Sequence, residues 1–257
     1  MSPPSDPPYI YRCTLDLLET TYFSSREVSS LYQTEPLIGH IALCYALGLA
    51  PVRYTNQGTI HYKEDLQHLN NAGVYVTPAA ISGTARYHLG QFNAQPETYW
   101  SAMGNNLLVT VPAGAWADKN GPSWYVHEGN NRRKLGTENR PQVGRIRALG
   151  VATRATFYVI SHAPYQPPAY IRLGKWMSKA HVDTQPMRII AEVDQGQIGG
   201  LLAPADLPDG TTILAGDQIT VKPTPLMRGA RLRGACYQLE DGALVPCGMR
   251  FAIEELP

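Results

Sequence analysis

The first regular segment of the sequence is YIYRCTLDLLE, residues Tyr9–Glu19. Its side chains alternate between two faces, and an alternation of period two is typical of a half-buried β-strand. One face carries Tyr9, Tyr11, Cys13, Leu15 and Leu17, and the other carries Arg12, Thr14 and Asp16. We therefore predict that the fold begins with a strand whose apolar face lies against the core.

A polar loop is expected over residues 20–34, and the next segment, TEPLIGHIALCYALG (Thr34–Gly48), has the pattern of a helix. Thr34 can cap its N-terminus, Pro36 suits the first turn, and Gly48 suits the position after the C-terminus. The apolar residues that recur at helical spacing are Leu37, Ile41, Cys44 and Tyr45. This spacing predicts a helix that packs one face on a sheet.

The rest of the chain is mostly strand-like. A short helix is predicted over Lys63–Asn70, and strands are predicted over 74–77, 107–111, 155–161 and 187–194. Residues from about 50 to 150 are turn-rich and indicate a long insertion, and residues 1–8, rich in proline, indicate a disordered arm. The order strand, helix, insertion and strands predicts a single α+β domain over 9–257 with a substantially antiparallel sheet.

The C-terminal segment RGACYQLEDGALVPCGMR has the pattern of a β-hairpin. A two-residue turn at Asp241–Gly242 would place Cys236 opposite Cys247 and Pro246 opposite Tyr237. A disulfide is geometrically possible there, and two packed free thiols are favoured for an intracellular protein. No cysteine pair has CxxC spacing, which argues against a zinc site.

The chain as a whole is close to neutral, with Lys+Arg 22 against Asp+Glu 21. It lacks the GxxxxGK[ST], GxSxG and HExxH motifs, and it has no GxGxxG after a strand. The N-terminus has no signal-peptide pattern. The longest apolar run, Ile41–Val52, is interrupted by Gly48 and Pro51 and is too short to span a membrane. We expect a cytoplasmic protein without a membrane segment, metal or cofactor.

Positive charge is concentrated in NNRRKLGTENRPQVGRIRALG, residues Asn130–Gly150, where Glu138 is the only acidic residue. Arginine binds phosphate bidentately, and the interleaved Gly, Asn and Pro fit a ribbon that can approach a nucleic-acid backbone. A solvated charged face is the alternative. The candidate RNA-binding residues here are Arg132, Arg133, Lys134, Arg140, Arg145 and Arg147.

Two further basic groups favour nucleic acid as the partner. Arg172, Lys175 and Lys179 surround Trp176, a combination of cations and a stacking ring that suits single-stranded nucleic acid. Arg228, Arg231 and Arg233 form the third group, in which Arg231 and Arg233 would share one face of a strand. We take Arg231 as a further RNA-binding candidate.

Histidines leave two other possibilities open. His61, Asp65 and His68 would share one helical face and could in principle hold a metal, although a solvated face explains them equally well. His162 and His181 lie on either side of the basic segment YIRLGKWMSK, where one of them could act as the general base of a metal-independent ribonuclease.

Several stretches together resemble a known family. LYQTEPLIGHIALCYALGL after YIYRCTLDLLETTYFSSRE, followed by ENRPQVGRIRALGVATRATFYVIS and YIRLGKWMSKAHV, is similar to the type I-D CRISPR effector subunit called Csc-one, of the Cas-five group. The likeness extends over roughly residues 9 to 190. Its motifs are structural, so its specificity comes from their occurrence together in this order.

The resemblance implies an RRM-like (ferredoxin-like) core with a long β-hairpin thumb in the insertion. It also implies a non-catalytic subunit that caps a Cascade-like complex and binds the 5′ handle of the crRNA. The implied partners are the backbone (Cas-seven type) subunit, the large (Cas-ten type) subunit and target DNA near the PAM. The alternative function is a metal-independent endoribonuclease that processes precursor crRNA, because some Cas-five relatives do so.

Overall fold

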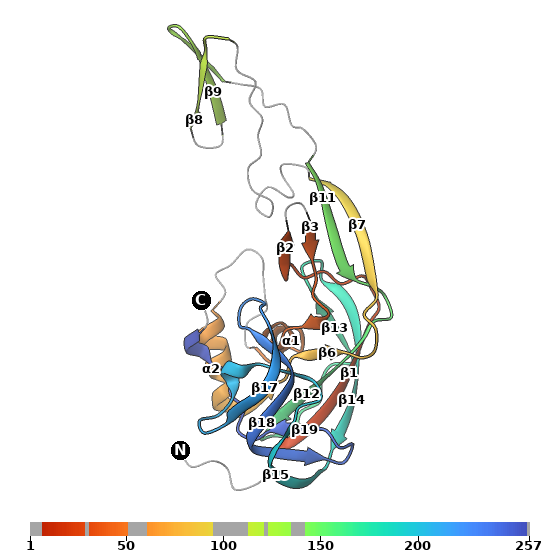
Figure 1. Ribbon diagram of the computed structural model, residues 1–257. Coiled ribbons are helices and arrows are strands. Elements are labelled where there is room, and N and C mark those ends of the chain that lie inside the picture. The colour runs from red at the N-terminus through yellow and green to blue at the C-terminus, as the bar shows by residue number, and fades with distance from the viewer. Residues whose placement is uncertain are drawn as a thin grey trace. The chain divides into compact units, whose positions relative to one another are not determined.

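The computed structural model describes residues 7–28, 31–50, 61–94, 113–120, 123–134 and 142–255 (Figure 1). Most of the predicted N-terminal arm and the strand predicted over 107–111 lie outside these residues. The chain divides into two compact units, of which the first comprises Met1–Leu89 and Arg147–Pro257. The second unit is Gly90–Ile146, within the predicted insertion.

The first unit is built on a seven-stranded sheet in the order β13-β14-β1-β12-β6-β4, with β5 also paired to β12. Its strands are β1 (Tyr9–Leu17), β4 (Leu37–Ile38), β5 (Val74–Val76), β6 (Ala79–Ile81), β12 (Arg154–Ser161), β13 (Tyr170–Leu173) and β14 (Ser178–Met187). Its strands pair antiparallel throughout the described residues. The strand predicted at Tyr9–Glu19 is confirmed, and Cys13, Leu15 and Leu17 of its predicted apolar face are fully buried. At its start the predicted face is wrong, because Tyr9 is 51% exposed while Ile10 is buried.

Two helices, α1 (His40–Ala46) and α2 (Tyr62–Ala72), lie in the connection between β1 and β5. The helix predicted over Lys63–Asn70 is confirmed as α2. The predicted start of the first helix is wrong, because the Thr34 hydroxyl bonds the backbone of Phe23 rather than a helix end. Leu37 and Ile38 pair with β6 instead, and the helix begins after Gly39. Its predicted end is correct, with Gly48 in the left-handed region at φ +69°.

The loop predicted over 20–34 is also wrong in part, since β2 (Arg26–Val28) and β3 (Leu31–Gln33) form a hairpin within it. Its short polar strands gave no clear apolar alternation. They belong to a four-stranded sheet in the order β2-β3-β11-β7, with β7 at Tyr87–Ala94 and β11 at Gln142–Leu149. A hydrogen bond from the Thr34 amide to the Arg147 carbonyl (2.8 Å) continues the pairing of β3 with β11. Because Thr34 and Arg147 are far apart in the sequence, local patterns could not reveal this contact.

A second sheet of the first unit has five strands around the long β18 (Leu226–Leu239). β15 (Ile189–Gln197), β16 (Leu201–Leu202), β17 (Thr212–Ile219) and β19 (Leu244–Pro246) each pair with it. Short 3-10 helices occur at η1 (Pro204–Asp206) and η2 (Ile253–Glu255). One hydrophobic cluster contains Leu15, Phe157 and Leu232, so both sheets share a core. The predicted α+β class, mostly antiparallel sheet with few helices, is confirmed.

The predicted register of the C-terminal hairpin is wrong by one residue. Cys236 faces Pro246, and the Cys247 amide bonds Ala235. Leu239 and Ala243 close a three-residue loop in which Gly242 has φ +83°, a type I turn followed by a left-handed residue. All four cysteines are free. Burial raises the pKa of the Cys247 thiol to about 11, so this thiol stays protonated at neutral pH.

A buried polar cluster fastens the C-terminal segment to the first unit. Asp206 of η1 accepts hydrogen bonds from the Tyr75 hydroxyl (2.8 Å) and the Ala252 amide (2.8 Å), and it pairs with His40 (3.1 Å). The side chains of His40 and Asp206 are each 3% exposed. Burial, and then the nearby carboxylate, raises the pKa of Tyr75. Because each of these groups is removed from water, the cluster depends on every partner being present.

The second unit contains a three-stranded sheet in the order β10-β9-β8, formed by β8 (Trp116–Asn120), β9 (Ser123–Glu128) and β10 (Asn131–Lys134). Val126 of β9 is fully buried in this sheet. Across the described part of the chain, no helix is long and apolar enough to cross a membrane.

Candidate nucleic-acid interface

The segment YIRLGKWMSK forms a hairpin whose strands are β13 and β14. Ile171 and Leu173 point into the core, so the alternate residues Tyr170 and Arg172 are exposed. Tyr170 faces His181 across the hairpin, and Arg172 faces Lys179. The hairpin surface, as we define it, consists of Tyr170, Arg172, Lys175, Trp176, Lys179 and His181. The fold thus brings together the four residues of the second predicted group.

The turn of this hairpin is held against the segment after β1. Gly174 has φ +71°, and a Cβ at this position would lie 2.5 Å from the carbonyl oxygen of Tyr22. The Lys175 amide donates to that same oxygen (2.9 Å), which explains the close approach. Only glycine combines this backbone conformation with this contact. The turn is therefore a fixed platform that holds Lys175 and Trp176 at the surface.

Trp176 is both packed and available. Its ring lies 5.0 Å from that of Tyr22, at an interplanar angle of 39°. Half of the tryptophan remains exposed (50%), whereas Tyr22 is buried at 7%. Burial raises the pKa of Tyr22, so the supporting ring stays neutral. A ring held from behind and open in front is suited to stacking with an unpaired base.

The cations of the hairpin surface are not neutralised in full. Glu19 accepts the Lys179 amide (2.8 Å) and lies 3.7 Å from the Arg172 guanidinium. Arg172 also donates to the Met177 carbonyl (3.1 Å). The Lys179 ammonium lies 4.5 Å from the centre of the Tyr170 ring. One carboxylate beside three cations leaves the surface with a positive balance.

The basic stretch Asn130–Gly150 is divided between the two units. Arg132, Arg133 and Lys134 are on β10 and, with Arg145 on β11, belong to the second unit, whereas Arg147 belongs to the first. Arg140 lies outside the described residues. Arg147 stacks on Tyr87 (4.6 Å), which gives it a packing role within the first unit.

Within the second unit, the arginines of β10 already have partners. Arg132 lies over the Tyr125 ring (4.0 Å) and 3.5 Å from Asp118. Arg133 lies 3.5 Å from Glu128. The register places Trp116, His127 and Arg132 on one face, and the Trp116 ring stacks on His127 at 3.8 Å. Trp116 is 59% exposed, so this face also offers an open aromatic ring.

Three aromatic or imidazole side chains of this second-unit face, Trp116, Tyr125 and His127, were missed by the sequence prediction. Tyr170 was missed as well, whereas His181 was named only as a possible general base beside the basic segment. The alternation Tyr170-x-Arg172 before a Gly-containing turn, and Lys179-x-His181 after it, was a usable signal for a hairpin with one shared face.

The candidate histidines lie in different places. Tyr9 pairs with Ser161, next to His162, whereas Asp16 pairs with His181. Tyr9 and Asp16 are seven positions apart on β1, which is about 24 Å of extended strand. His162 packs against Gly73 at the end of α2. His181 contacts the Tyr170 ring at 5.2 Å, so it is the histidine that lies within the basic hairpin.

No metal site is formed by the described residues, in which no group of three His, Cys, Asp or Glu side chains could hold an ion. Asp65, one of the three candidates on α2, instead accepts the Tyr45 hydroxyl (2.7 Å) and is buried. That contact gives Asp65 a structural role at the junction of α1 and α2.

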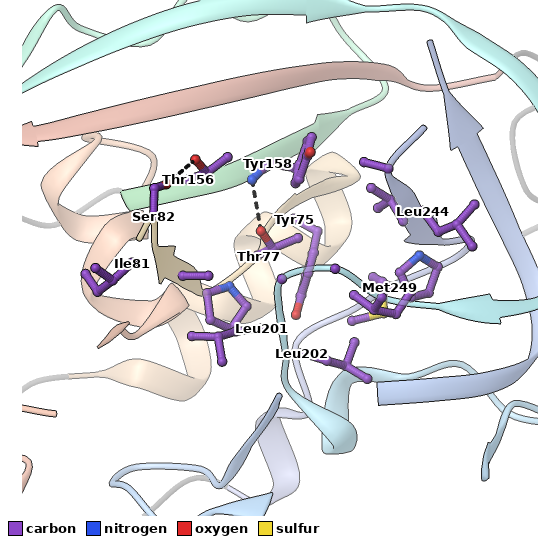
Figure 2. A pocket seen from close by; sticks show the side chains of 18 residues that line it. Tyr75, Thr77, Ile81, Ser82, Thr156, Tyr158, Leu201, Leu202, Leu244 and Met249 are labelled. Atoms are coloured by element: carbon purple, nitrogen blue, oxygen red, sulfur yellow. Dashed lines mark hydrogen bonds between the residues drawn. The ribbon is translucent and has the colours of Figure 1, made fainter. Parts of the chain in front are cut away.

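A pocket of about 280 Å³ lies between the β5–β6 segment, the loop before β16 and the β18–β19 hairpin (Figure 2). Figure 2 shows the Thr77 hydroxyl bonded to the Tyr158 amide (2.9 Å) and Ser82 beside Thr156 (3.1 Å). Its lining contains no charged residue, histidine or cysteine. The pocket therefore offers neither a countercharge for phosphate nor an acid–base group, and it is separate from the hairpin surface.

Comparison with known proteins identifies the class as CRISPR-associated. The chain belongs to the family described as Type I-D CRISPR-associated protein Cas5/Csc1, and the match covers residues 8–254. This confirms the resemblance predicted from the sequence. No curated protein matches the chain.

Among solved structures, a similar chain occurs in the "Cryo-EM structure of the Type III-B Cmr-beta bound to cognate target RNA and AMPPnP, state 1". The two chains are 10% identical, the alignment covers 86% of each, and the TM-score is 0.39.

Proposed function

We propose that the chain is a non-catalytic subunit of a type I-D CRISPR effector complex and binds the 5′ handle of the crRNA. It caps the complex and contacts the backbone (Cas-seven type) and large (Cas-ten type) subunits. It also contributes to recognition of target DNA near the PAM, and it works in the cytoplasm. The observation that carries the proposal is the hairpin surface, found on a chain of the Cas5/Csc1 family.

The chemistry of this surface favours single-stranded RNA. Arg172, Lys175 and Lys179 supply positive charge for phosphates, while Trp176 and Tyr170 are 50% and 57% exposed. Single-stranded nucleic acid presents both its backbone and the faces of its bases, and proteins bind it by combining cations with aromatic rings. A duplex would leave the exposed rings without bases to contact.

We further propose that the main sheet is an RRM-like core. The strand order supports this, since β14, β1, β12 and the β5–β6 segment are neighbours, as the last, first, third and second strands of that fold are. α1 and α2 lie between β1 and β5, where the first helix of the fold belongs. Residues 162–169 and β13 take the place of its second helix, which is a departure from the pattern.

The second unit is proposed as the thumb, because it is inserted between β6 and β12. Its share of the RNA interface would come from Arg132, Arg133, Lys134, Arg140 and Arg145, and Arg147 follows at the point where the chain re-enters the first unit. The exposed Trp116 on the same face as Arg132 supports this assignment. Of the three cations on β10, Lys134 is the most available, because Arg132 and Arg133 have carboxylate neighbours.

The proposal is tested with the variant Arg172→Gln/Lys175→Gln/Lys179→Gln and an RNA that carries the 5′ handle. For single strands the slope of log affinity against log salt changes by about 0.7 per phosphate contact, so we expect a slope smaller by roughly 2. The matched control is Arg26→Gln/Arg188→Gln/Arg250→Gln, which removes equal charge from exposed positions elsewhere in the first unit. Equal losses in the two variants would contradict the hairpin assignment.

A second candidate function is metal-independent cleavage of precursor crRNA. The observation that favours it is the contact of Tyr170 with both His181 (5.2 Å between rings) and the Lys179 ammonium (4.5 Å). His181 could take the proton of a 2′-hydroxyl, which attacks the adjacent phosphate, while Lys179 stabilises the added charge. The bond from phosphorus to the 5′-oxygen then breaks, and the leaving oxygen takes a proton from solvent, which gives a 2′,3′-cyclic phosphate and a 5′-hydroxyl.

Incubation of the purified chain with its repeat RNA in a chelator distinguishes the two functions. Our primary proposal expects no cleavage. Cleavage that His181→Ala abolishes and His162→Ala leaves intact would establish the nuclease instead. The His162 variant is a suitable control because this residue lies at the far end of β1 from the hairpin surface.

A further inference from the structure

Arg231 lies on a different sheet from the hairpin surface and has two arginine neighbours. Arg228, Arg231 and Arg233 are all on β18 and all exposed. We call these three residues the β18 arginine face. Arg231 and Arg233 are two positions apart on a strand and share a face by simple alternation. Arg228 is three positions from Arg231, so alternation alone would place it on the other side.

A β-bulge in β18 brings Arg228 back to the same side of the strand as Arg231. Arg228 pairs with Asp217 and Arg231 with Ala215, so β18 has one more residue than β17 between the two pairs. Gly229, at φ +61°, lies in this interval and supplies the left-handed conformation that such a bulge requires. Cross-strand partners point to the same side, and Asp217 and Ala215 are two positions apart on β17. The bulge therefore brings Arg228 to the face of Arg231 and Arg233.

These arginines lack the ion pairs that occupy others in the first unit. Arg154 pairs with Asp16, Arg172 with Glu19 and Arg188 with Glu240. In the described part of the chain, no carboxylate lies within ion-pair distance of Arg228, Arg231 or Arg233. Their cross-strand partners are Gln195, Gln197, Leu201, Thr212, Ala215 and Asp217, of which only Asp217 is acidic. Three unpaired guanidinium groups on one face attract a polyanion.

The surroundings of the face distinguish it from the hairpin surface. The exposed large apolar residues of β15 and β17 are Ile190, Ile213 and Leu214, and none is aromatic. A site for single strands needs aromatic rings on which bases can stack, as the hairpin surface has. A duplex keeps its bases stacked inside and presents phosphates, which arginine and amide side chains bind. Arg231, Arg233, Gln195 and Gln197 are side chains of these two kinds.

We infer that the β18 arginine face binds the phosphate backbone of double-stranded DNA. Arg231 accordingly belongs to this second site, where it acts with Arg228 and Arg233, rather than to the crRNA interface. This inference rests on the proposed role of the chain beside target DNA and names the surface that performs it. The contact is independent of base sequence, because it reaches the backbone and no base edge.

The test compares binding of a labelled DNA duplex and of the crRNA by the full-length chain over a series of salt concentrations. Arg228→Gln/Arg231→Gln/Arg233→Gln is expected to bind the duplex more weakly. Its slope of log affinity against log salt should be smaller by roughly 2.7, about 0.9 for each of three phosphate contacts. Its affinity for crRNA should stay within about twofold of the wild-type value, since the three charges lie on a different sheet from the hairpin surface and salt screens their effect there.

Two controls separate this site from the hairpin surface. Arg26→Gln/Arg188→Gln/Arg250→Gln has the same net charge and should keep duplex binding. Arg172→Gln/Lys175→Gln/Lys179→Gln should lose crRNA binding and keep duplex binding. If the hairpin variant keeps crRNA binding, the proposed function fails while the β18 site can still stand.

The inference is overturned by any of three results. The β18 variant binds the duplex as well as the wild type, or it loses no more than the charge-matched control, or it loses crRNA and duplex binding equally. In the first case the arginines serve an acidic protein partner instead. Circular dichroism and the thermal midpoint confirm that each variant is folded, and these exposed substitutions are expected to leave both unchanged.

Discussion

Arg172 and Lys179 face each other directly across the β13–β14 hairpin, and Glu19 contacts both of them. Like charges in directly opposed positions destabilise a sheet, and the Glu19 carboxylate, which lies 3.7 Å from the Arg172 guanidinium and accepts the Lys179 backbone amide, offsets part of this repulsion. A phosphate bound at the hairpin would do the same. The hairpin surface is therefore held in a conformation suited to an anion. Glu19 competes with a bound phosphate for the positive charge of this surface.

The first prediction concerns this competitor. Glu19→Gln keeps an acceptor for the Lys179 amide and removes the negative charge. We expect tighter binding of the crRNA handle, a steeper salt dependence, and a free energy of unfolding lower by about 0.5–1 kcal/mol, because the cations then repel each other. Filter binding and urea denaturation measure the two effects. Unchanged affinity would show that phosphate does not reach this pair.

The second prediction concerns Trp176. Trp176→Ala should lower RNA affinity roughly 5- to 150-fold, since stacking contributes about 1–3 kcal/mol per base. The salt slope should stay the same, because no charge is removed. The control is Ile190→Ala, another exposed apolar residue (58%), which lies on β15. If RNA affinity stays constant and only the thermal midpoint falls, the ring serves to pack on Tyr22 and not to bind.

Local patterns in the sequence were sufficient for some elements and insufficient for others. The strand at Tyr9–Leu17 and helix α2 follow directly from the periodicity of their apolar residues. The start of α1 does not, because the Thr34 hydroxyl has its partner at Phe23, and that contact exists only after folding. The hairpin register likewise depended on whether the turn at Gly242 has two or three loop residues, which the dipeptide Asp-Gly alone does not decide.

The candidate site shows the same division. Sequence proximity correctly grouped Arg172, Lys175 and Lys179 around Trp176. It could not reveal that Tyr22 supports the ring from behind, since the two residues are far apart in the chain. It also suggested one basic patch over Arg132–Arg147, whereas the chain divides these residues between two units. The side of β18 on which Arg228 lies depends on a bulge at Gly229, and strict alternation along the strand does not predict that bulge.

The third prediction concerns the hairpin turn. Gly174→Ala forces a Cβ into φ +71° and against the Tyr22 carbonyl, which should cost about 1–3 kcal/mol of the free energy of unfolding. RNA affinity should fall with it, because Lys175 and Trp176 lose their fixed positions. Gly199→Ala is the control, as a Cβ there meets nothing within 4 Å. Urea midpoints measure the difference, and equal midpoints in the two variants would contradict the strain at Gly174.

The fourth prediction concerns the buried cluster around Asp206. Asp206→Ala removes one side chain that bonds His40, Tyr75 and the Ala252 amide at once. Loss of one partner from a buried charged cluster costs about 3–5 kcal/mol, because the remaining polar groups are left without hydrogen bonds away from water. Asp209→Ala, an exposed carboxylate three positions further along the chain, should change stability by less than about 0.5 kcal/mol.

Hydrogen exchange should also show faster opening at Arg250 and Ala252 in the Asp206→Ala variant. The Arg250 amide donates to the Asp206 carbonyl, and the Ala252 amide donates to the Asp206 carboxylate. If those amides stay protected in Asp206→Ala, the C-terminal segment is held by Phe251 and the Asn70 side chain instead, and the cluster is not its fastening.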